Sequence, residues 1–121
     1  MKISVILPVF NEEKFIKKAI ESVLNQSLSD FELIIVNDGS TDATLDIIES
    51  FNDDRITVIS QSNQGPGASR NKALEIVSGD YLMFLDSDDW FCDDALKIAY
   101  DEAKTNDTDI SIFQIIKYNQ G

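Results

Sequence analysis

An apolar run that ends in a group of carboxylates is the feature of this sequence that most constrains its fold. Residues 81–85 read YLMFL, and Asp86, Ser87, Asp88 and Asp89 follow directly. Such a run is typical of a buried strand, and open α/β sheets bind ligands at the carboxyl ends of their strands. Neighbouring carboxylates repel one another and raise one another's pKa, and a bound divalent cation would offset this repulsion. Oxygen ligands favour Mg²⁺ or Mn²⁺ as that cation. A solvated turn that caps the next helix is the alternative interpretation.

Composition limits both the size and the chemistry of the protein. With 121 residues, 43% of them hydrophobic, the chain fits one domain. It has no histidine, which excludes Ser-His-Asp and Cys-His catalysis and histidine-ligated zinc. A formal net charge of -12 argues against nucleic acid as a partner. One cysteine, no cleavable leader and no bilayer-length apolar segment predict a cytoplasmic protein.

Strand and helix signals alternate along the chain, which predicts an α/β fold. Runs typical of strands lie at residues 3–9, 33–36, 56–59, 81–85 and 110–116. Helices are expected to begin near Asn11, Asp42, Ala68 and Asp93. The third helix is expected to end at Ser78-Gly79, with Gly79 in the left-handed conformation.

Right-handed crossovers make the geometry of such a sheet predictable, and the expected strand order is 3-2-1-4, with a further strand beyond the fourth. The expected architecture is a three-layer α/β/α, Rossmann-like fold with a mainly parallel sheet. Its switch point lies between the first and fourth strands, so residues 9–12 and 86–89 should border one crevice. Asp38, after the second strand, should lie at the same edge. Three separate polar segments therefore converge, which indicates a ligand site.

Asp38 and Arg70 are further candidates for this site. An Asx turn before Gly39 would explain Asp38, but its carboxylate could also accept a hydrogen bond from a ligand N–H such as uracil N3–H, worth roughly 1.5–3 kcal/mol. Arg70 and Lys72 lie on a helix that follows a glycine-rich loop, and a solvated helix face would explain both. Because they are two residues apart, they cannot share one narrow face, and Arg70 is expected to point inward.

Four motifs, in this order, resemble those of the family 2 glycosyltransferases, which have the GT-A fold. They are ILPVFNE at residues 6–12, VNDGSTD at 36–42, GASRN at 67–71 and DSDD at 86–89. The resemblance covers residue 3 to about residue 96.

The resemblance implies a site for a nucleotide-sugar donor, with UDP favoured over GDP or dTDP. The donor-binding set is Pro8, Val9, Phe10, Glu12, Asp38, Arg70, Asp86, Ser87 and Asp88. Within it, Pro8, Phe10 and Glu12 would surround the base, Asp38 would bond it, Arg70 would lie near the base or diphosphate, and Asp86 near the ribose or sugar. Asp88 matches the last Asp of the DXD motif, so the metal set is Asp88 and Asp86, with Mn²⁺ or Mg²⁺ bridging the donor phosphates.

Members of this family invert the anomeric centre, because an acceptor hydroxyl attacks C1 while the nucleoside diphosphate leaves. Their catalytic base lies downstream of the DXD motif, in a segment that this chain does not contain, so no catalytic residue is assigned. We expect residues 1–121 to be a single donor-binding domain, truncated C-terminally from a longer transferase.

The longer transferase would use a glycan or lipid-linked acceptor in cell-surface polysaccharide synthesis. It would act in the cytoplasm, with peripheral association at the inner face of the membrane. The apolar strand at residues 110–116 has no later element to cover it, and is expected to self-associate.

Three other classes of protein share parts of this pattern. In a haloacid-dehalogenase-like phosphatase Asp86 would be the nucleophile and Asp88 the acid, but Trp90 stands where that family has Thr or Val. A receiver-type signalling domain needs a phosphorylatable Asp after the third strand, where this chain has Ser60-Gln61. A module that binds nucleotide sugars without catalysis is the third alternative.

Overall fold

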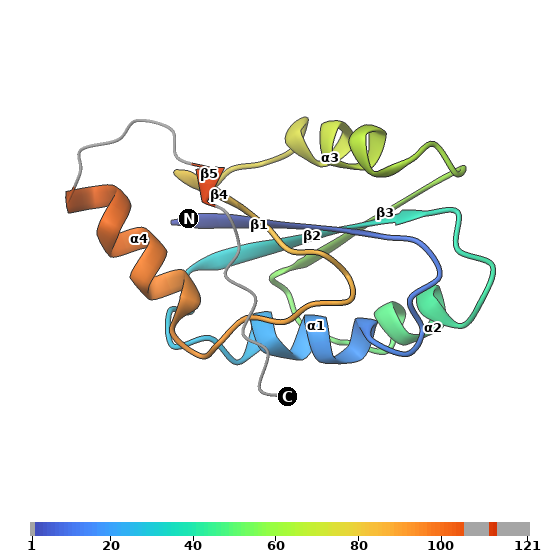
Figure 1. The fold of residues 1–121 in the computed structure, drawn as a ribbon, viewed down its shortest axis with the longest axis horizontal. Coiled ribbons are helices and arrows are strands. Elements are labelled where there is room, and N and C mark those ends of the chain that lie inside the picture. Colours follow the sequence, from blue (N-terminus) through green and yellow to red (C-terminus); the bar gives the residue numbers. More distant parts are fainter. Residues whose placement is uncertain (1, 106–111, 114–121) are drawn as a thin grey trace.

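The computed structural model describes residues 2–105 and 112–113, which form a parallel sheet with helices on both faces (Figure 1). The elements are β1 (Ile3–Val9), α1 (Ile16–Leu24), β2 (Phe31–Asp38), α2 (Thr44–Glu49), β3 (Ile56–Gln61), α3 (Pro66–Leu74), β4 (Tyr81–Phe84), α4 (Ala95–Thr105) and β5 (Ile112–Phe113). The strand order is β3-β2-β1-β4-β5, and every pair is parallel. The expected fold class and the order 3-2-1-4 with a further strand are confirmed.

Alternation along β1 explains the two layers of helices. Ile3, Val5 and Leu7 face one side and pack with the apolar residues of α1, with Ile48 of α2 and with Leu96 of α4. Ile6 faces the other side and packs with Ala73 of α3. Accordingly, α3 covers one face of the sheet, while α1, α2 and α4 cover the opposite face (Figure 1).

The first helix begins later than expected, because Asn11 has a different partner. Its side-chain Oδ1 accepts the Thr41 N–H at 2.7 Å, and its own N–H donates to Ser40 Oγ at 3.0 Å. Asn11 therefore joins the loop after β1 to the loop after β2, with a left-handed φ of 50°. The expectation of a helix cap there was wrong, since an Asn side chain can satisfy loop amides as well as helical ones. Instead, α1 begins at Ile16.

The expected end of the third helix was also wrong. α3 ends at Leu74, and the left-handed glycines of the described residues are Gly39 and Gly65. Gly79 is required for a different reason: a Cβ there would lie 2.5 Å from the backbone nitrogen of Ser4. Any side chain at this position would push the α3–β4 connection away from β1.

The remaining differences are small. α4 begins at Ala95, and both β2 and β3 extend two residues past their apolar runs, to Asp38 and Gln61. Of the expected strand at residues 110–116, β5 is described, while residues 110–111 and 114–116 lie outside the described residues, so self-association stays a prediction. No helix in the described part of the chain has the length and apolar character needed to cross a membrane.

A buried carboxylate joins three elements at the end of the sheet where β1 begins. Glu32 accepts hydrogen bonds from Ser4 Oγ at 2.6 Å and from both the N–H and the Oγ of Ser78, at 2.6 Å and 2.8 Å. Burial raises the pKa of Glu32, but these hydrogen bonds outweigh it and hold the pKa below its ordinary value. The contacts tie the α3–β4 connection to β1 and β2.

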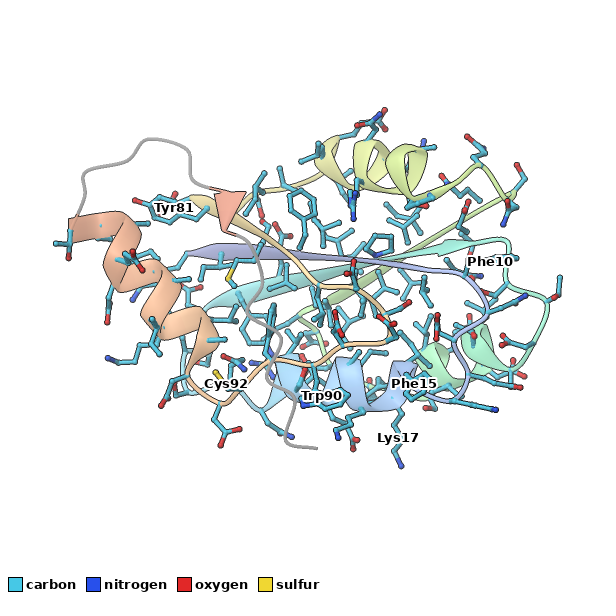
Figure 2. The ribbon with its side chains drawn as sticks, in the orientation of Figure 1. Phe10, Phe15, Lys17, Tyr81, Trp90 and Cys92 are labelled. Carbon is cyan, nitrogen blue, oxygen red and sulfur yellow. The ribbon has the colours of Figure 1, made fainter. Side chains whose placement is uncertain are left out.

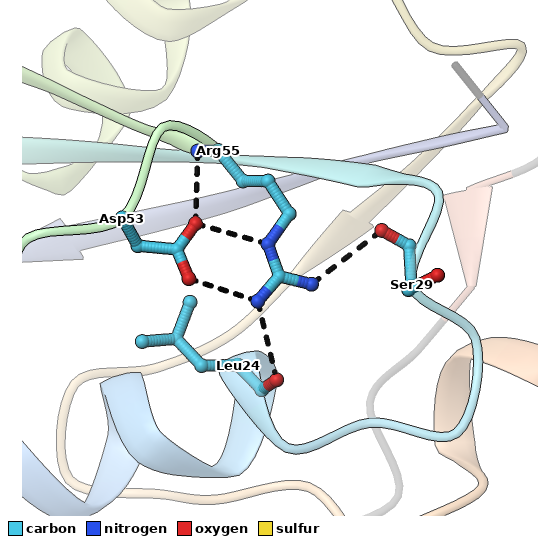
Figure 3. Close-up of polar contacts among 4 residues, drawn as sticks. All are labelled: Leu24, Ser29, Asp53 and Arg55. Atoms are coloured by element: carbon cyan, nitrogen blue, oxygen red, sulfur yellow. Dashed lines mark hydrogen bonds and ion pairs between the residues drawn. The ribbon is translucent and has the colours of Figure 1, made fainter.

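At the same end of the sheet, Arg55 joins two loops (Figure 3). Its guanidinium contacts the Asp53 carboxylate through Nε at 3.0 Å and Nη2 at 2.9 Å. It also donates to the carbonyl oxygen of Leu24, the last residue of α1, at 3.4 Å and to that of Ser29, in the α1–β2 connection, at 3.5 Å. The hydrogen bonds from the Arg55 side chain and backbone N–H lower the pKa of Asp53 to about 2. The bidentate geometry favours the ionised carboxylate.

We predict that Asp53→Asn lowers the free energy of unfolding at pH 7 by about 1 kcal/mol, because hydrogen bonds to a charged partner are lost. The pKa of Asp53 is about 2 in the folded protein against an ordinary 3.8, so this contribution is fully present above about pH 5 and is lost as the pH falls toward 2. Urea unfolding of both proteins between pH 7 and pH 2 measures the difference. A difference that stays constant over this range would contradict the assignment.

Candidate functional site

One pocket lies at the carboxyl edge of the sheet, where β1, β2 and β4 end and α3 begins. It has a volume of about 230 Å³. Its lining residues are Pro8, Val9, Phe10, Glu12, Asp38, Pro66, Ser69, Arg70, Asp86, Ser87 and Asp88. All nine residues of the expected donor-binding set are therefore brought together in one pocket, as the strand order predicts. Their individual roles stay predictions.

Arg70 is the basic residue that lines this pocket. Its Nη2 lies 3.8 Å from Asp86 Oδ1, and its guanidinium carbon lies 5.7 Å from the centre of the Phe84 ring. Lys72 instead contacts Glu75 at 3.6 Å and points away from the pocket. Both groups of the Arg70–Asp86 pair are about half exposed or more, so the pair holds Arg70 only weakly. The guanidinium can therefore turn toward an anion in the pocket.

Asp38 is buried, and its carboxylate organises the loop before α3. Oδ1 accepts hydrogen bonds from Gln61 Nε2 at 2.9 Å and the Gln64 N–H at 2.8 Å, and Oδ2 accepts the Gly65 N–H at 2.9 Å. Burial raises the pKa of Asp38, but the three hydrogen bonds outweigh it and keep the pKa below its ordinary value. Asp38 is thus an anion at neutral pH.

The turn at Gly39 is held by the side chain of the neighbouring Asn37 and not by that of Asp38. Asn37 Oδ1 accepts the N–H of Ser40 at 3.2 Å, across the left-handed Gly39. The carboxylate of Asp38 is consequently not used in the turn and lines the pocket.

Three residues in or beside the pocket were missed from the sequence: Pro66 and Ser69, which line it, and Gln61, which contacts Asp38. Gln61 ends β3 directly opposite Asp38 in the parallel register, and its Nε2 also donates to Ser69 Oγ at 3.2 Å. Ser69 is fully buried and lines the pocket next to Arg70 in the chain. Gln61 could have been identified from the sequence, because it is a polar residue at the carboxyl end of a parallel strand, as Asp38 is.

The acidic loop after β4 can offer three carboxylate ligands. One oxygen each of Asp86, Asp88 and Asp89 lie within 4.8 Å of one another, with Asp89 buried and the other two exposed. The Asp89 N–H donates to the Asp86 carbonyl at 3.0 Å and closes the loop. Hard oxygen donors gathered in this way fit Mg²⁺ or Mn²⁺. Asp89 adds a third carboxylate to the two that the family resemblance implies.

Glu12 places a further carboxylate beside this loop. Burial raises its pKa above the ordinary value, and the negative charges of Asp88 and Asp42 raise it further. The Glu12 N–H donates to Thr44 Oγ1 at 2.9 Å, which fixes the loop after β1 against the start of α2. The pocket therefore has an excess of negative charge on one side, and a bound cation would relieve it.

Comparison with protein families matches residues 4–121 to the model described as glycosyl transferase family 2. Among curated proteins, glycosyltransferase GlyA of Streptococcus pneumoniae serotype 4 is 39% identical over 121 residues, which cover 98% of this chain and 17% of GlyA. Poly(ribitol-phosphate) beta-glucosyltransferase of Bacillus spizizenii is 40% identical over 118 residues, covering 93% of this chain and 19% of that protein. The chain thus spans less than a fifth of the length of either relative.

Two solved structures have the same fold over most of the chain. Residues 1–349 of S. aureus TarS in complex with UDP-GlcNAc match with a TM-score of 0.82 and 38% identity, over 87% of this chain and 32% of that one. Glucosyl-3-phosphoglycerate synthase from Mycobacterium tuberculosis in complex with Mn²⁺, UDP and phosphoglyceric acid matches with a TM-score of 0.59 and 32% identity, over 74% of this chain and 34% of that one.

Proposed function

Because this chain belongs to glycosyl transferase family 2, we propose that it is the donor-binding domain of an inverting glycosyltransferase. The observation that carries the proposal is the convergence of all nine expected donor-binding residues on one pocket. The family membership removes the phosphatase and receiver-domain alternatives. A module that binds nucleotide sugars without catalysis would bind the metal and the nucleotide in the same way, and only sugar transfer by the longer protein distinguishes a transferase from it.

The hydrogen bonds already made by Asp38 favour a uracil or thymine base. An ionised carboxylate has about four acceptor positions, and three of them are used by Gln61, Gln64 and Gly65. The position that is left, on Oδ2, suits the single imide N–H of uracil or thymine. Guanine presents two adjacent N–H donors and would need both oxygens. The structure of TarS with UDP-GlcNAc supports UDP as the nucleotide.

The opposite side of the pocket is suited to the diphosphate. Arg70 supplies positive charge there, and Asp86, Asp88 and Asp89 would hold Mn²⁺ or Mg²⁺. When bound, the metal would offset phosphate charge and act as a Lewis acid toward the leaving diphosphate. This help is needed because the chain has a net charge of -12, which alone would repel a diphosphate. The Mn²⁺ complex of the mycobacterial synthase supports this metal.

We assign no catalytic base among the described residues. In this proposal residues 1–121 are a single domain of a longer protein, which supplies the base and binds a glycan or lipid-linked acceptor for cell-surface polysaccharide synthesis. The similarity to poly(ribitol-phosphate) beta-glucosyltransferase supports that pathway class. The longer protein would work in the cytoplasm, at the inner face of the membrane.

We predict that UDP binds this chain at least tenfold more tightly than GDP when Mn²⁺ is present, because one base donor fits Asp38 and two do not. Calorimetric titration with UDP, dTDP and GDP measures the preference, and dTDP should bind about as well as UDP. Equal affinity for GDP would contradict the role given to Asp38.

We predict that Asp88→Asn removes the Mn²⁺-dependent part of UDP affinity, about tenfold or more, and leaves the binding measured without metal nearly unchanged. Asp80→Asn is the matched control, because it removes one exposed carboxylate just before β4, at the opposite edge of the sheet. The same titrations with and without Mn²⁺ measure both variants. Unaltered metal dependence in Asp88→Asn would rule out the proposed metal set.

A further inference from the structure

We propose that Gln26, together with Ser22, is a positioning residue that fixes the geometry of the acidic loop at residues 86–89. The inference rests on the proposed function, because it treats this loop as the metal-binding end of the donor site. Gln26 lies just after α1 and is buried, with 7% of its surface exposed. It does not line the pocket, and it acts through the segment that follows the acidic loop.

The Gln26 side chain uses both ends of its amide to hold that segment. Nε2 donates to the Cys92 carbonyl at 2.6 Å and to the Ser22 carbonyl at 2.9 Å, while Oε1 accepts the Leu96 N–H at 3.0 Å. The Leu96 N–H is in the first turn of α4, where backbone donors have no partner within the helix. Gln26 therefore caps α4 from the end of α1. A carboxylate in its place could accept from Leu96 but could not donate to two carbonyls.

Other residues of α1 hold the preceding part of the same segment. Ser22 Oγ accepts the Phe91 N–H at 3.0 Å, and the Lys18 ammonium lies 3.7 Å from the centre of the Trp90 ring. Residues 18, 22 and 26 recur every four residues, so they lie along one side of the helix and its extension. Figure 2 shows the labelled Trp90 and Cys92 side chains along α1.

The acidic loop is therefore held between two anchors. On the upstream side, the Leu85 N–H donates to the Ile6 carbonyl at 2.9 Å. On the downstream side, Phe91 is held by Ser22. Residues 86–90 lie between these anchors and include all three carboxylates of the acidic loop. If the downstream anchor is released, the carboxylates can separate. Part of the free energy of metal binding is then used to order them, so the affinity for the metal falls.

Titration with Mn²⁺ alone tests this role in the variants Gln26→Glu and Ser22→Ala. Gln26→Glu keeps the size and the acceptor for Leu96 but removes both donors, and Ser22→Ala removes the acceptor for Phe91. We expect Mn²⁺ to bind roughly tenfold more weakly to Gln26→Glu, the scale seen when an outer contact of a metal site is lost. Electron paramagnetic resonance of free Mn²⁺ measures the affinity. Quenching of Trp90, the single tryptophan of the sequence, gives an independent readout.

Asp53→Asn is the control for a general loss of stability, because the Asp53–Arg55 pair contacts the carbonyl oxygens of Leu24 and Ser29 and makes no hydrogen bond to the side chains of Gln26 and Ser22. Circular dichroism establishes that each variant is folded at the temperature of the titration. If Gln26→Glu does not fold, the Mn²⁺ affinity of Ser22→Ala tests the proposal. Weaker Mn²⁺ binding in the α1 variants but not in Asp53→Asn supports the proposal. Unchanged Mn²⁺ affinity in folded α1 variants overturns this inference and leaves the proposed metal set standing. A wild-type chain that does not bind Mn²⁺ overturns both this inference and the proposed metal set.

Discussion

The parallel pairing of β1 with β4 is the interaction on which the rest of the site depends. It aligns Ile6 with Phe84 and continues through the hydrogen bond from Leu85 to Ile6, so the acidic loop leaves the sheet beside the loop after β1. Since β1 also pairs with β2 on its other side, the loop with Asp38 reaches the same edge. A one-residue shift of β4 would move its side chains to the opposite face of the sheet and displace the carboxylates from the pocket.

Charge decides what this edge can bind. Asp38, Glu12 and the acidic loop place carboxylates on two sides of one pocket, while Arg70 supplies its positive charge. Asp38 has nearly all of its acceptor positions filled by the loop before α3, and it is suited to a single N–H donor. The acidic loop gathers three carboxylates and suits a cation. The two sides of the pocket therefore differ in chemistry, as the base and the diphosphate of a nucleotide do.

Much of this could be predicted from the sequence, because two general rules were sufficient. Apolar runs that alternate with helices indicate a parallel α/β sheet, and the carboxyl ends of parallel strands share one edge, which brought Asp38 and Asp88 together. What the sequence did not reveal depends on contacts between distant segments. Asn11 bonds the loop after β2, Gly79 lies against Ser4, and Gln26 caps a helix about seventy residues away. Local propensity contains no information on such partners.

A crystal structure of this chain with UDP and Mn²⁺ tests the central claim most directly. We predict the metal at ligand distance, about 2.1 Å, from carboxylate oxygens of Asp86 and Asp88, with the diphosphate between the metal and Arg70. The uracil N3–H should donate to Asp38 Oδ2 at hydrogen-bond distance. A nucleotide bound elsewhere, or a base with its imide turned away from Asp38, would contradict the account.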